Sequence, residues 1–264
     1  MVPGAAVRHD ERLVGSDRVL AVLVELGNHP EGVTLDELAT ALKSSKPTVH
    51  RALASLRRAS LAELTSRGVY SLGDEFFHIA FRNYEGRPER STLEPLMRAL
   101  ADEYGETVHY AVLDGKDVVY RAKVDAAQGA VRLTSTVGGR NPAYRTAVGK
   151  LLLSQIITTK AELLEWLDGQ ELDARTPFTI TDADALLSEL HNTRERGYAI
   201  DDQENEIGIN CVAVPVFLGR SVNSAGALSI SALRFRLPID RLVLTVPTLR
   251  ARVESIAPRE THPT

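Results

Sequence analysis

Residues 34–72 read TLDELATALKSSKPTVHRALASLRRASLAELTSRGVYSL. Thr34 and Glu37 have the spacing of a capping box, in which each side chain accepts a hydrogen bond from the backbone N–H of the other residue. A second helix start follows at Ser45, with Pro47 in the first turn, where its missing N–H costs little. Two helices joined by a short turn and followed by a hairpin are the order of a winged helix-turn-helix.

Apolar residues recur at helical spacing in both of these helices. In the first helix they are Leu35, Leu38, Ala39 and Leu42, and in the second they are Val49, Leu53 and Leu56. Burial of that face turns the polar side of the second helix to solvent. The side chains expected there are Lys46, Thr48, His50, Arg51, Ser55 and Arg58.

The charge of this stretch points to DNA. Residues 38–62 contain Lys43, Lys46, Arg51, Arg57 and Arg58 and neither Asp nor Glu, whereas residues 1–90 balance 12 basic against 12 acidic side chains. The cationic stretch is therefore a local patch that can be aimed at a partner. A solvated helix face is the alternative, but it does not account for the missing acids. We expect base contacts from Lys46, Thr48, His50 and Arg51, with Ser55 on the same face and phosphate contacts from Arg57, Arg58 and Arg67.

A hairpin is predicted by two β-prone runs, 62–65 and 69–72, joined by Ser66-Arg67-Gly68. Gly68 can take the positive φ that a tight turn needs. Arg67 at the tip could reach the DNA backbone or minor groove, or could be an ordinary solvated turn residue. A supporting helix is expected from about residue 16 to residue 28.

The whole chain is long enough for two domains. It has 264 residues, of which 44% are hydrophobic and 25% charged, and Cys211 is its one cysteine. An intrachain disulfide is impossible, and a cysteine-based zinc site is not expected. No apolar run approaches the roughly 18 residues of a membrane span, and the first residues lack the apolar region of a signal peptide, so we expect a cytoplasmic protein.

An aromatic-rich amphipathic helix is expected to link the domains. It contains Phe76, Phe77, Phe81 and Tyr84, and Pro88 should end it. These aromatics are expected to pack either on a second subunit or on the hairpin domain itself. The predicted organisation is a winged helix-turn-helix domain at 13–73, a linker helix at 74–90 and a second domain at 91–258.

The second half predicts an α+β domain, with an antiparallel sheet flanked by helices. Helices are expected at 91–104, from 146, at 161–167, 182–196 and 239–256, and strands at 107–113, 117–123, 130–137, 198–201, 211–217 and 226–233.

Three segments of this half could converge on a small molecule. Residues 146–150, TAVGK, look like a helix start whose free N–H groups would accept a carboxylate. Asp201 ends one strand, Cys211 begins another, and Ser229 and Ser231 share one face of a third. Each has a simpler explanation: Lys150 may be solvated, Cys211 may be a small core residue, and residues 201–206 may form a hydrated acidic loop or weak cation ligands. Arg132 and Arg145 suggest an anion nearby, with solvated arginines as the alternative.

Across nearly its full length the sequence resembles the IclR family of bacterial transcription regulators. The resemblance is carried by residues 46–53 (KPTVHRAL), 70–73 (YSLG), 146–150 (TAVGK), 197–202 (GYAIDD), 208–216 (GINCVAVPV) and 228–231 (LSIS). It implies a winged helix-turn-helix followed by a GAF-like domain that binds an organic acid, in a dimer or a dimer of dimers. The implied effector contacts are the backbone amides of Ala147 and Val148, the side chains of Asp201, Cys211, Ser229 and Ser231, and apolar lining at Leu133 and Ile209.

We therefore expect a ligand-responsive regulator, without a metal or other cofactor, that binds double-stranded DNA at an inverted repeat. Two alternatives remain at this point. One is a thiol-dependent enzyme in which Cys211, aided by His109 or Asp201, is the nucleophile. The other is a DNA-binding dimerisation module without any ligand.

Overall fold

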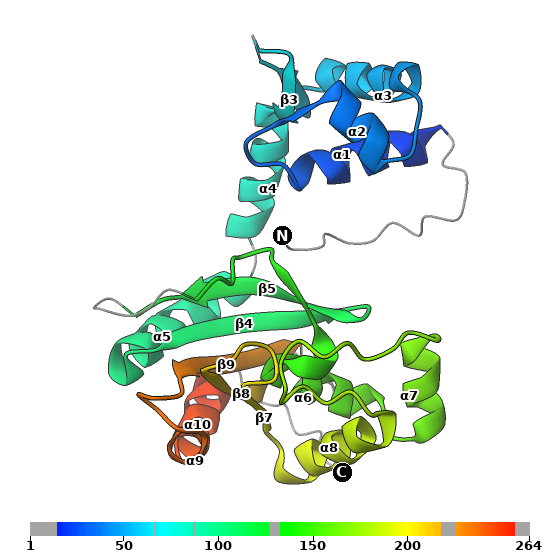
Figure 1. Cartoon of the computed structure of the whole chain (residues 1–264). Coiled ribbons are helices and arrows are strands. Elements are labelled where there is room, and N and C mark those ends of the chain that lie inside the picture. The colour runs from blue at the N-terminus through cyan, green and yellow to red at the C-terminus, as the bar shows by residue number, and fades with distance from the viewer. Residues whose placement is uncertain (1–14, 66, 87, 127–132, 218–224, 257–264) are drawn as a thin grey trace, which may run out of the picture. The chain divides into compact units, whose positions relative to one another are not determined.

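The computed structural model describes residues 15–65, 67–86, 88–126, 133–217 and 225–256, with the backbone alone at 88–90. The chain divides into two compact units, Met1–Arg87 and Pro88–Thr264 (Figure 1).

The first unit is a small helical domain with a three-stranded antiparallel sheet, in the strand order β1-β3-β2. Its elements are α1 (Ser16–Gly27), β1 (Val33–Thr34), α2 (Leu35–Ala41), α3 (Lys46–Arg58), β2 (Ala62–Leu64), β3 (Val69–Leu72) and α4 (Asp74–Glu85). The predicted winged helix-turn-helix is confirmed, and the short β1 is an addition to the prediction.

Local sequence signals determine where these helices begin and turn. The capping box forms as predicted, because Glu37 N donates to Thr34 Oγ1 at 3.3 Å and Thr34 N donates to Glu37 Oε2 at 2.9 Å. The turn between α2 and α3 places Lys43 at a φ of 44°, in the left-handed region that favours glycine. Gly68 in the hairpin has the predicted positive φ, 76°.

The second unit contains a six-stranded sheet in the order β6-β5-β4-β9-β8-β7, and every neighbouring pair is antiparallel. Its elements are α5 (Pro88–Tyr104), β4 (Thr107–Asp114), β5 (Asp117–Val124), β6 (Arg140–Pro142), the 3₁₀ turn η1 (Ala143–Arg145), α6 (Ala147–Ile156), α7 (Lys160–Leu167), α8 (Ala183–Arg196), β7 (Ala199–Asp202), β8 (Ile209–Val216), β9 (Gly226–Leu233), α9 (Ile239–Val243) and α10 (Val246–Ile256).

Helices cover both faces of this sheet (Figure 1). Side chains such as Tyr110, Val212 and Ile230 form one core with α5 and α10, whereas Ala111 and Ala213 form the other core with α6, α7 and α8. Alternate strand residues point to opposite faces. The odd-numbered residues of β8 and β9 near Cys211 and Ser231 therefore lie on the α6 face.

Four expectations about this unit are wrong. The stretch 133–137 of the strand predicted at 130–137 is irregular, with 130–132 outside the described residues, and the edge strand is β6, where Pro142 is tolerated because an edge needs fewer N–H donors. The linker helix stops at Glu85 rather than at residue 90, and the next helix begins at Pro88 rather than at residue 91, because proline suits a first turn. The helix predicted at 239–256 is broken into α9 and α10, with Pro247 in the first turn of α10. Among the described residues, no helix has the length and apolar character to cross a membrane.

Candidate functional site

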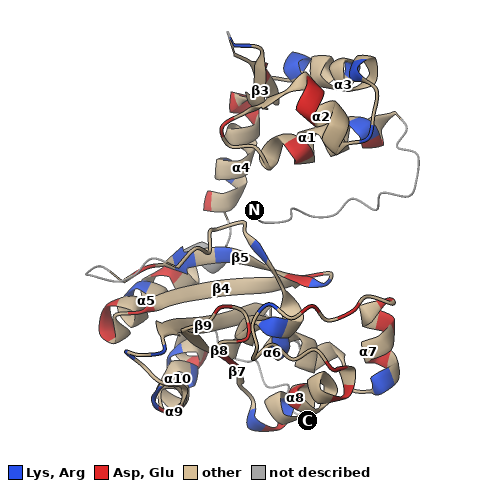
Figure 2. Ribbon diagram, viewed as in Figure 1, with Lys and Arg blue, Asp and Glu red and all other residues tan. Residues whose placement is uncertain are grey.

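The exposed side of α3 is the first candidate site. Val49, Leu53 and Leu56 are buried in the core of the first unit. The other side presents the predicted DNA-contact residues: Lys46, His50, Arg51, Arg57 and Arg58 are exposed, and Thr48 and Ser55 are half-buried. Basic side chains recur along α3, whereas acidic ones lie on α1 and α2 (Figure 2).

Hydroxyl groups orient two of the arginines on this surface. Arg51 Nη2 donates to Thr48 Oγ1 at 3.4 Å, and Arg58 Nη2 donates to Ser55 Oγ at 3.0 Å. Lys46 instead pairs with Asp36 of α2 at 2.8 Å. Both partners of that pair are exposed, so the interaction is weak and a phosphate or base can replace it.

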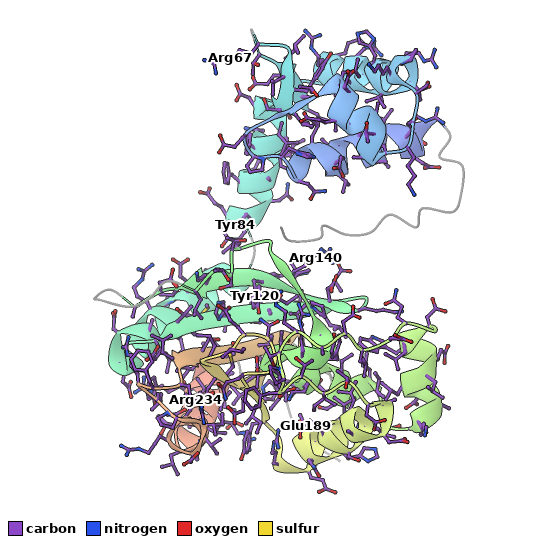
Figure 3. All side chains as sticks on the ribbon, in the orientation of Figure 1. Arg67, Tyr84, Tyr120, Arg140, Glu189 and Arg234 are labelled. Carbon is purple, nitrogen blue, oxygen red and sulfur yellow. The ribbon has the colours of Figure 1, made fainter. Side chains whose placement is uncertain are left out.

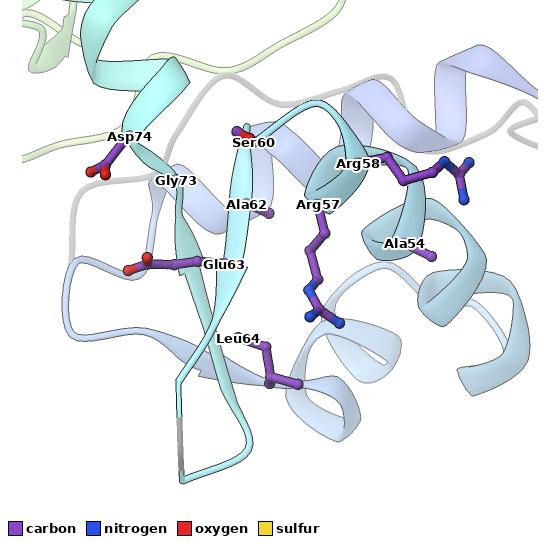
Figure 4. Close-up of a pocket in the computed structure, with 9 residues that line it drawn as sticks. All are labelled: Ala54, Arg57, Arg58, Ser60, Ala62, Glu63, Leu64, Gly73 and Asp74. Atoms are coloured by element: carbon purple, nitrogen blue, oxygen red, sulfur yellow. The ribbon is translucent and has the colours of Figure 1, made fainter.

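The wing completes this surface. Arg67 is exposed at the tip of the β2–β3 hairpin (Figure 3). Between α3 and β2 lies a groove of about 680 Å³, lined by Ala54, Arg57, Arg58, Ser60, Ala62, Glu63, Leu64, Gly73 and Asp74. In Figure 4 the side chain of Arg57 extends into the space between α3 and β2, whereas that of Arg58 points away from β2. The two arginines therefore face different directions, although sequence reasoning gave them one role.

The second candidate site is a polar cluster on the α6 face of the large sheet, which we name the sheet-face cluster: His109, Asp201, Cys211, Ser229 and Ser231. Strand register brings it together. Cys211 lies opposite Ser231 and Asp201, and Ser229 lies opposite His109. All but the half-buried Cys211 are at most 5% exposed.

Side-chain hydrogen bonds connect the centre of this cluster. Cys211 Sγ donates to Ser231 Oγ at 3.2 Å, Ser231 Oγ lies 3.2 Å from His109 Nδ1, and His109 Nε2 lies 2.8 Å from Ser135 Oγ. Burial, together with the Lys123 charge, lowers the pKa of His109 to about 3, so the imidazole is neutral. Tyr120 packs on this ring at 4.9 Å (Figure 3).

Cys211 is not an activated nucleophile. Burial and the Asp201 carboxyl raise the pKa of its thiol well above the usual value, which keeps it protonated. Catalysis by a thiol needs the opposite shift. His109 contacts Ser231 rather than Cys211, so the base required by the enzyme alternative is not in place.

The start of α6 is rigidly held. Thr146 Oγ1 accepts from Gly149 N at 3.0 Å and Thr146 O accepts from Lys150 N at 2.9 Å. The amides of Ala147 and Val148 have no acceptor within the helix. Gly149 is required here, since a Cβ at this position would lie 2.1 Å from the carbonyl oxygen of Ala143 in η1.

Buried charges join α6 to the loop after β7. Lys150, only 1% exposed, donates to Glu204 and lies 3.7 Å from Glu189 of α8. Asp201 Oδ1 accepts from Glu204 N at 2.7 Å. The solvated alternatives for Lys150 and for the acidic loop are therefore wrong at Lys150, Asp201 and Glu204. Within the described ranges, no group of three or more His, Cys, Asp or Glu side chains could hold a metal ion.

The remaining predicted residues lie around the cluster, except one. Ile209 precedes Cys211 by two positions on β8 and shares its face, and Leu133 O accepts from Lys123 Nζ at 2.8 Å. Arg145 donates to Asn205 at 2.9 Å, while Arg132 is outside the described residues. Sequence reasoning did not select four neighbours of the cluster: Ser135, Tyr120, Lys123 and, as a binding residue, His109. Strand alternation from Thr107 would have placed His109 on the α6 face.

Comparisons with known proteins agree with this geometry. Residues 88–258 match the family model described as bacterial transcriptional regulator IclR C-terminal, and residues 16–68 match a MarR family model. The HTH-type transcriptional regulator KdgR of Escherichia coli K12 is 34% identical over 91% of this chain and 90% of its own length.

Solved structures share the fold. An IclR transcriptional regulator from Alicyclobacillus acidocaldarius has a TM-score of 0.77 and 25% identity, covering 94% of this chain and all of its own. An IclR homologue from Microbacterium hydrocarbonoxydans, complexed with 4-hydroxybenzoate, has a TM-score of 0.73 and 23% identity over 90% of this chain and 97% of its own. The chain therefore belongs to the IclR family of bacterial transcriptional regulators.

Proposed function

We propose that this regulator senses a small organic acid at the sheet-face cluster and that effector binding changes its affinity for an inverted-repeat operator. One observation carries the proposal. Buried polar side chains from β4, β7, β8 and β9 meet on the sheet face that α6 covers, although burying so many polar groups is costly unless they have partners. A regulator of chromosomal genes would work in the cytoplasm.

Each effector contact has a distinct chemical role. The amides of Ala147 and Val148 accept a carboxylate, Asp201, Ser229 and Ser231 bond to hydroxyl or carbonyl groups, and Cys211, Leu133 and Ile209 supply softer apolar lining. The 4-hydroxybenzoate complex of the Microbacterium homologue supports including aromatic acids among the candidates.

The DNA complex follows from the exposed face of α3. We place α3 in the major groove, with base contacts from Lys46, Thr48, His50 and Arg51, and phosphate contacts from Ser55, Arg57, Arg58 and Arg67. The affinity should fall by about one log unit per log unit of salt for each phosphate that is neutralised.

Dimerisation is supported by α4. None of its described side chains is buried, and Phe77 and Phe81, which stack at 6.0 Å, are 42% and 61% exposed. Packing within the same domain therefore does not account for these aromatics, and we place a second subunit against them, in a dimer or a dimer of dimers. Within this organisation residues 13–73 bind DNA, the linker lies within 74–90 and residues 91–258 bind the effector. Phe81→Glu should shift the sedimentation coefficient toward that of the monomer, whereas the exposed Glu85→Ala should not.

Thermal-shift screening of keto acids, sugar acids and aromatic acids tests the sensing role. A bound effector raises the melting temperature by mass action. Ser231→Ala should abolish the shift, while Ser188→Ala, which removes an exposed hydroxyl that bonds only to the Asp184 carbonyl of its own helix in the described structure, should preserve it. A screen without any hit would favour the ligand-free module.

Two further assays separate the remaining alternatives. Mobility-shift assays with the chain's own promoter region should show a retarded band that the effector alters, and no band even at low salt would refute DNA regulation. Rapid alkylation of Cys211 by iodoacetamide at neutral pH would favour the enzyme, whereas slow alkylation that a bound acid suppresses would favour the sensor.

A further inference from the structure

The cations around the sheet-face cluster already have anionic or carbonyl partners. Lys150 bonds to Glu204, and Arg196 pairs with Glu189 at 2.7 Å. On the other side, Lys123 donates to the carbonyl oxygens of Leu133 and Ser135 at 2.8 and 2.9 Å, and lies 3.2 Å from Asp125. These side chains therefore offer little uncompensated positive charge to a ligand.

The charge count on the α6 side leaves one carboxyl group over. Three carboxyl groups, Asp201, Glu204 and Glu189, share two cations, Lys150 and Arg196. Asp201 is 3% exposed and accepts backbone N–H groups instead of contacting a cation. A second sign of missing donors is Glu204 Oε2, a buried oxygen with no hydrogen-bond partner among the described residues.

Burial and the Glu204 carboxyl raise the pKa of Asp201 to about 7, against a smaller opposing effect of Lys150. The geometry and the charge count therefore agree that Asp201 holds a proton near neutral pH.

We propose that the effector carries one carboxylate only, and that Asp201 meets it as a neutral carboxylic acid. This inference rests on the proposed function and adds the charge class of the effector. The amides of Ala147 and Val148, at the positive end of the α6 dipole, can hold a single carboxylate. A second carboxylate would be buried beside three existing carboxyl groups without a free cation, which is strongly unfavourable. A protonated Asp201 instead donates a hydrogen bond to an uncharged oxygen of the effector.

Several groups face Asp201 from the surrounding elements: Glu204 and Glu206 from the loop after β7, Lys150 from α6, Arg145 from η1, Cys211 from β8 and Tyr120 from β5. Burial raises the pKa of both Cys211 and Tyr120, so these two stay neutral through the physiological range. Glu204 has a raised pKa but remains bonded to Lys150. We therefore assign to Asp201 the loss of effector affinity expected above pH 7, up to tenfold per pH unit.

Matched pairs of acids test the charge class. The probes are gluconate and glucarate, lactate and malate, and 4-hydroxybenzoate and terephthalate, in each of which the second acid adds one carboxylate. Thermal shift and calorimetry on the full chain should show at least tenfold tighter binding of the monocarboxylate in any pair that binds. Equal or tighter binding of the dicarboxylate would overturn the proposal. Arg132→Ala identifies the cause, because loss of dicarboxylate binding in that variant would show that Arg132 supplies the second cation.

The proton on Asp201 can be tested without any effector. The melting temperature of the wild type relative to Asp201→Asn should fall between pH 5 and pH 7.5 and then level off, because only the wild-type side chain loses a proton. Asp202→Asn, one residue along β7, should run parallel to the wild type. Parallel curves for Asp201→Asn would overturn the proposal even if an effector is found, whereas a pH effect without any binding acid would count against the sensing role alone.

Discussion

Gly149→Ala tests whether the start of α6 is as closely packed as the structure indicates. The added Cβ would lie 2.1 Å from the oxygen and 2.4 Å from the Cα of Ala143. Both are backbone atoms, so no rotamer change can relieve the overlap. Overpacking of a core costs about 1–3 kcal/mol, and a backbone clash belongs at the upper end of that range. Alanine recovers about 1 kcal/mol of helix propensity over glycine. We expect a net loss of about 2 kcal/mol.

Urea unfolding of the full chain measures this loss. The one tryptophan, Trp166 in α7, reports on the second unit because its indole donates to the carbonyl of Gly115. Gly27→Ala is the control, since it ends α1 and a Cβ there meets nothing within 4 Å. It should leave the tryptophan transition unchanged. A Gly149→Ala transition at or above the wild-type urea concentration would refute the close contact between α6 and η1.

Other predictions test separate parts of the structure. Lys43→Gly should raise the free energy of unfolding of the first unit by about 0.5–1 kcal/mol, because Lys43 has a positive φ, and Lys43→Ala should bring no such gain in thermal unfolding. Lys150→Met should cost about 3–5 kcal/mol in urea unfolding by leaving Glu204 buried without its cation, and adding Glu204→Gln should recover much of this loss. The lowered pKa of His109 means that the unfolded chain binds the extra proton first, so wild-type stability relative to His109→Gln should fall as the pH drops from 6.5 to 4.5, by about 1.4 kcal/mol per pH unit. Arg67→Ala should reduce the slope of log affinity against log salt by about one unit in fluorescence anisotropy with operator DNA, whereas an unchanged slope would place Arg67 away from the phosphates.

Short-range signals account for the parts of the fold that the sequence predicted well. Thr34, Thr159 and Asp182 each cap a helix at the expected place, and Gly197 ends α8 in the left-handed conformation. Caps are settled within about four residues, so spacing alone is sufficient to find them. The failures at β6 and at α10 arise because Pro142 and Pro247 were tolerated by tertiary context, at a sheet edge and in a first helical turn.

The candidate site depended on information that spacing does not contain. The polar strand residues could be identified in advance, but the register that sets Cys211 opposite both Asp201 and Ser231 is a long-range property of the sheet. Family resemblance supplied that convergence. It did not supply the Lys150–Glu204 pair, whose members are 54 residues apart. A charged residue is normally assigned to solvent, and only the fold shows that its partner is buried with it.

The firm placement of α6 restricts where an allosteric signal can arise. Thr146 caps the helix, Gly149 packs against backbone and Lys150 is anchored by a buried ion pair, so the anion-binding amides are held before an effector arrives. A ligand shifts a conformational equilibrium only through different affinity for the two states, and a contact that is the same in both contributes nothing. The differential contacts should therefore lie in elements with fewer such constraints. Residues 133–136 are irregular, and Lys123 and His109 hold them through a few side-chain hydrogen bonds. Substitutions that break these bonds, rather than those at α6, are expected to separate effector binding from the DNA response.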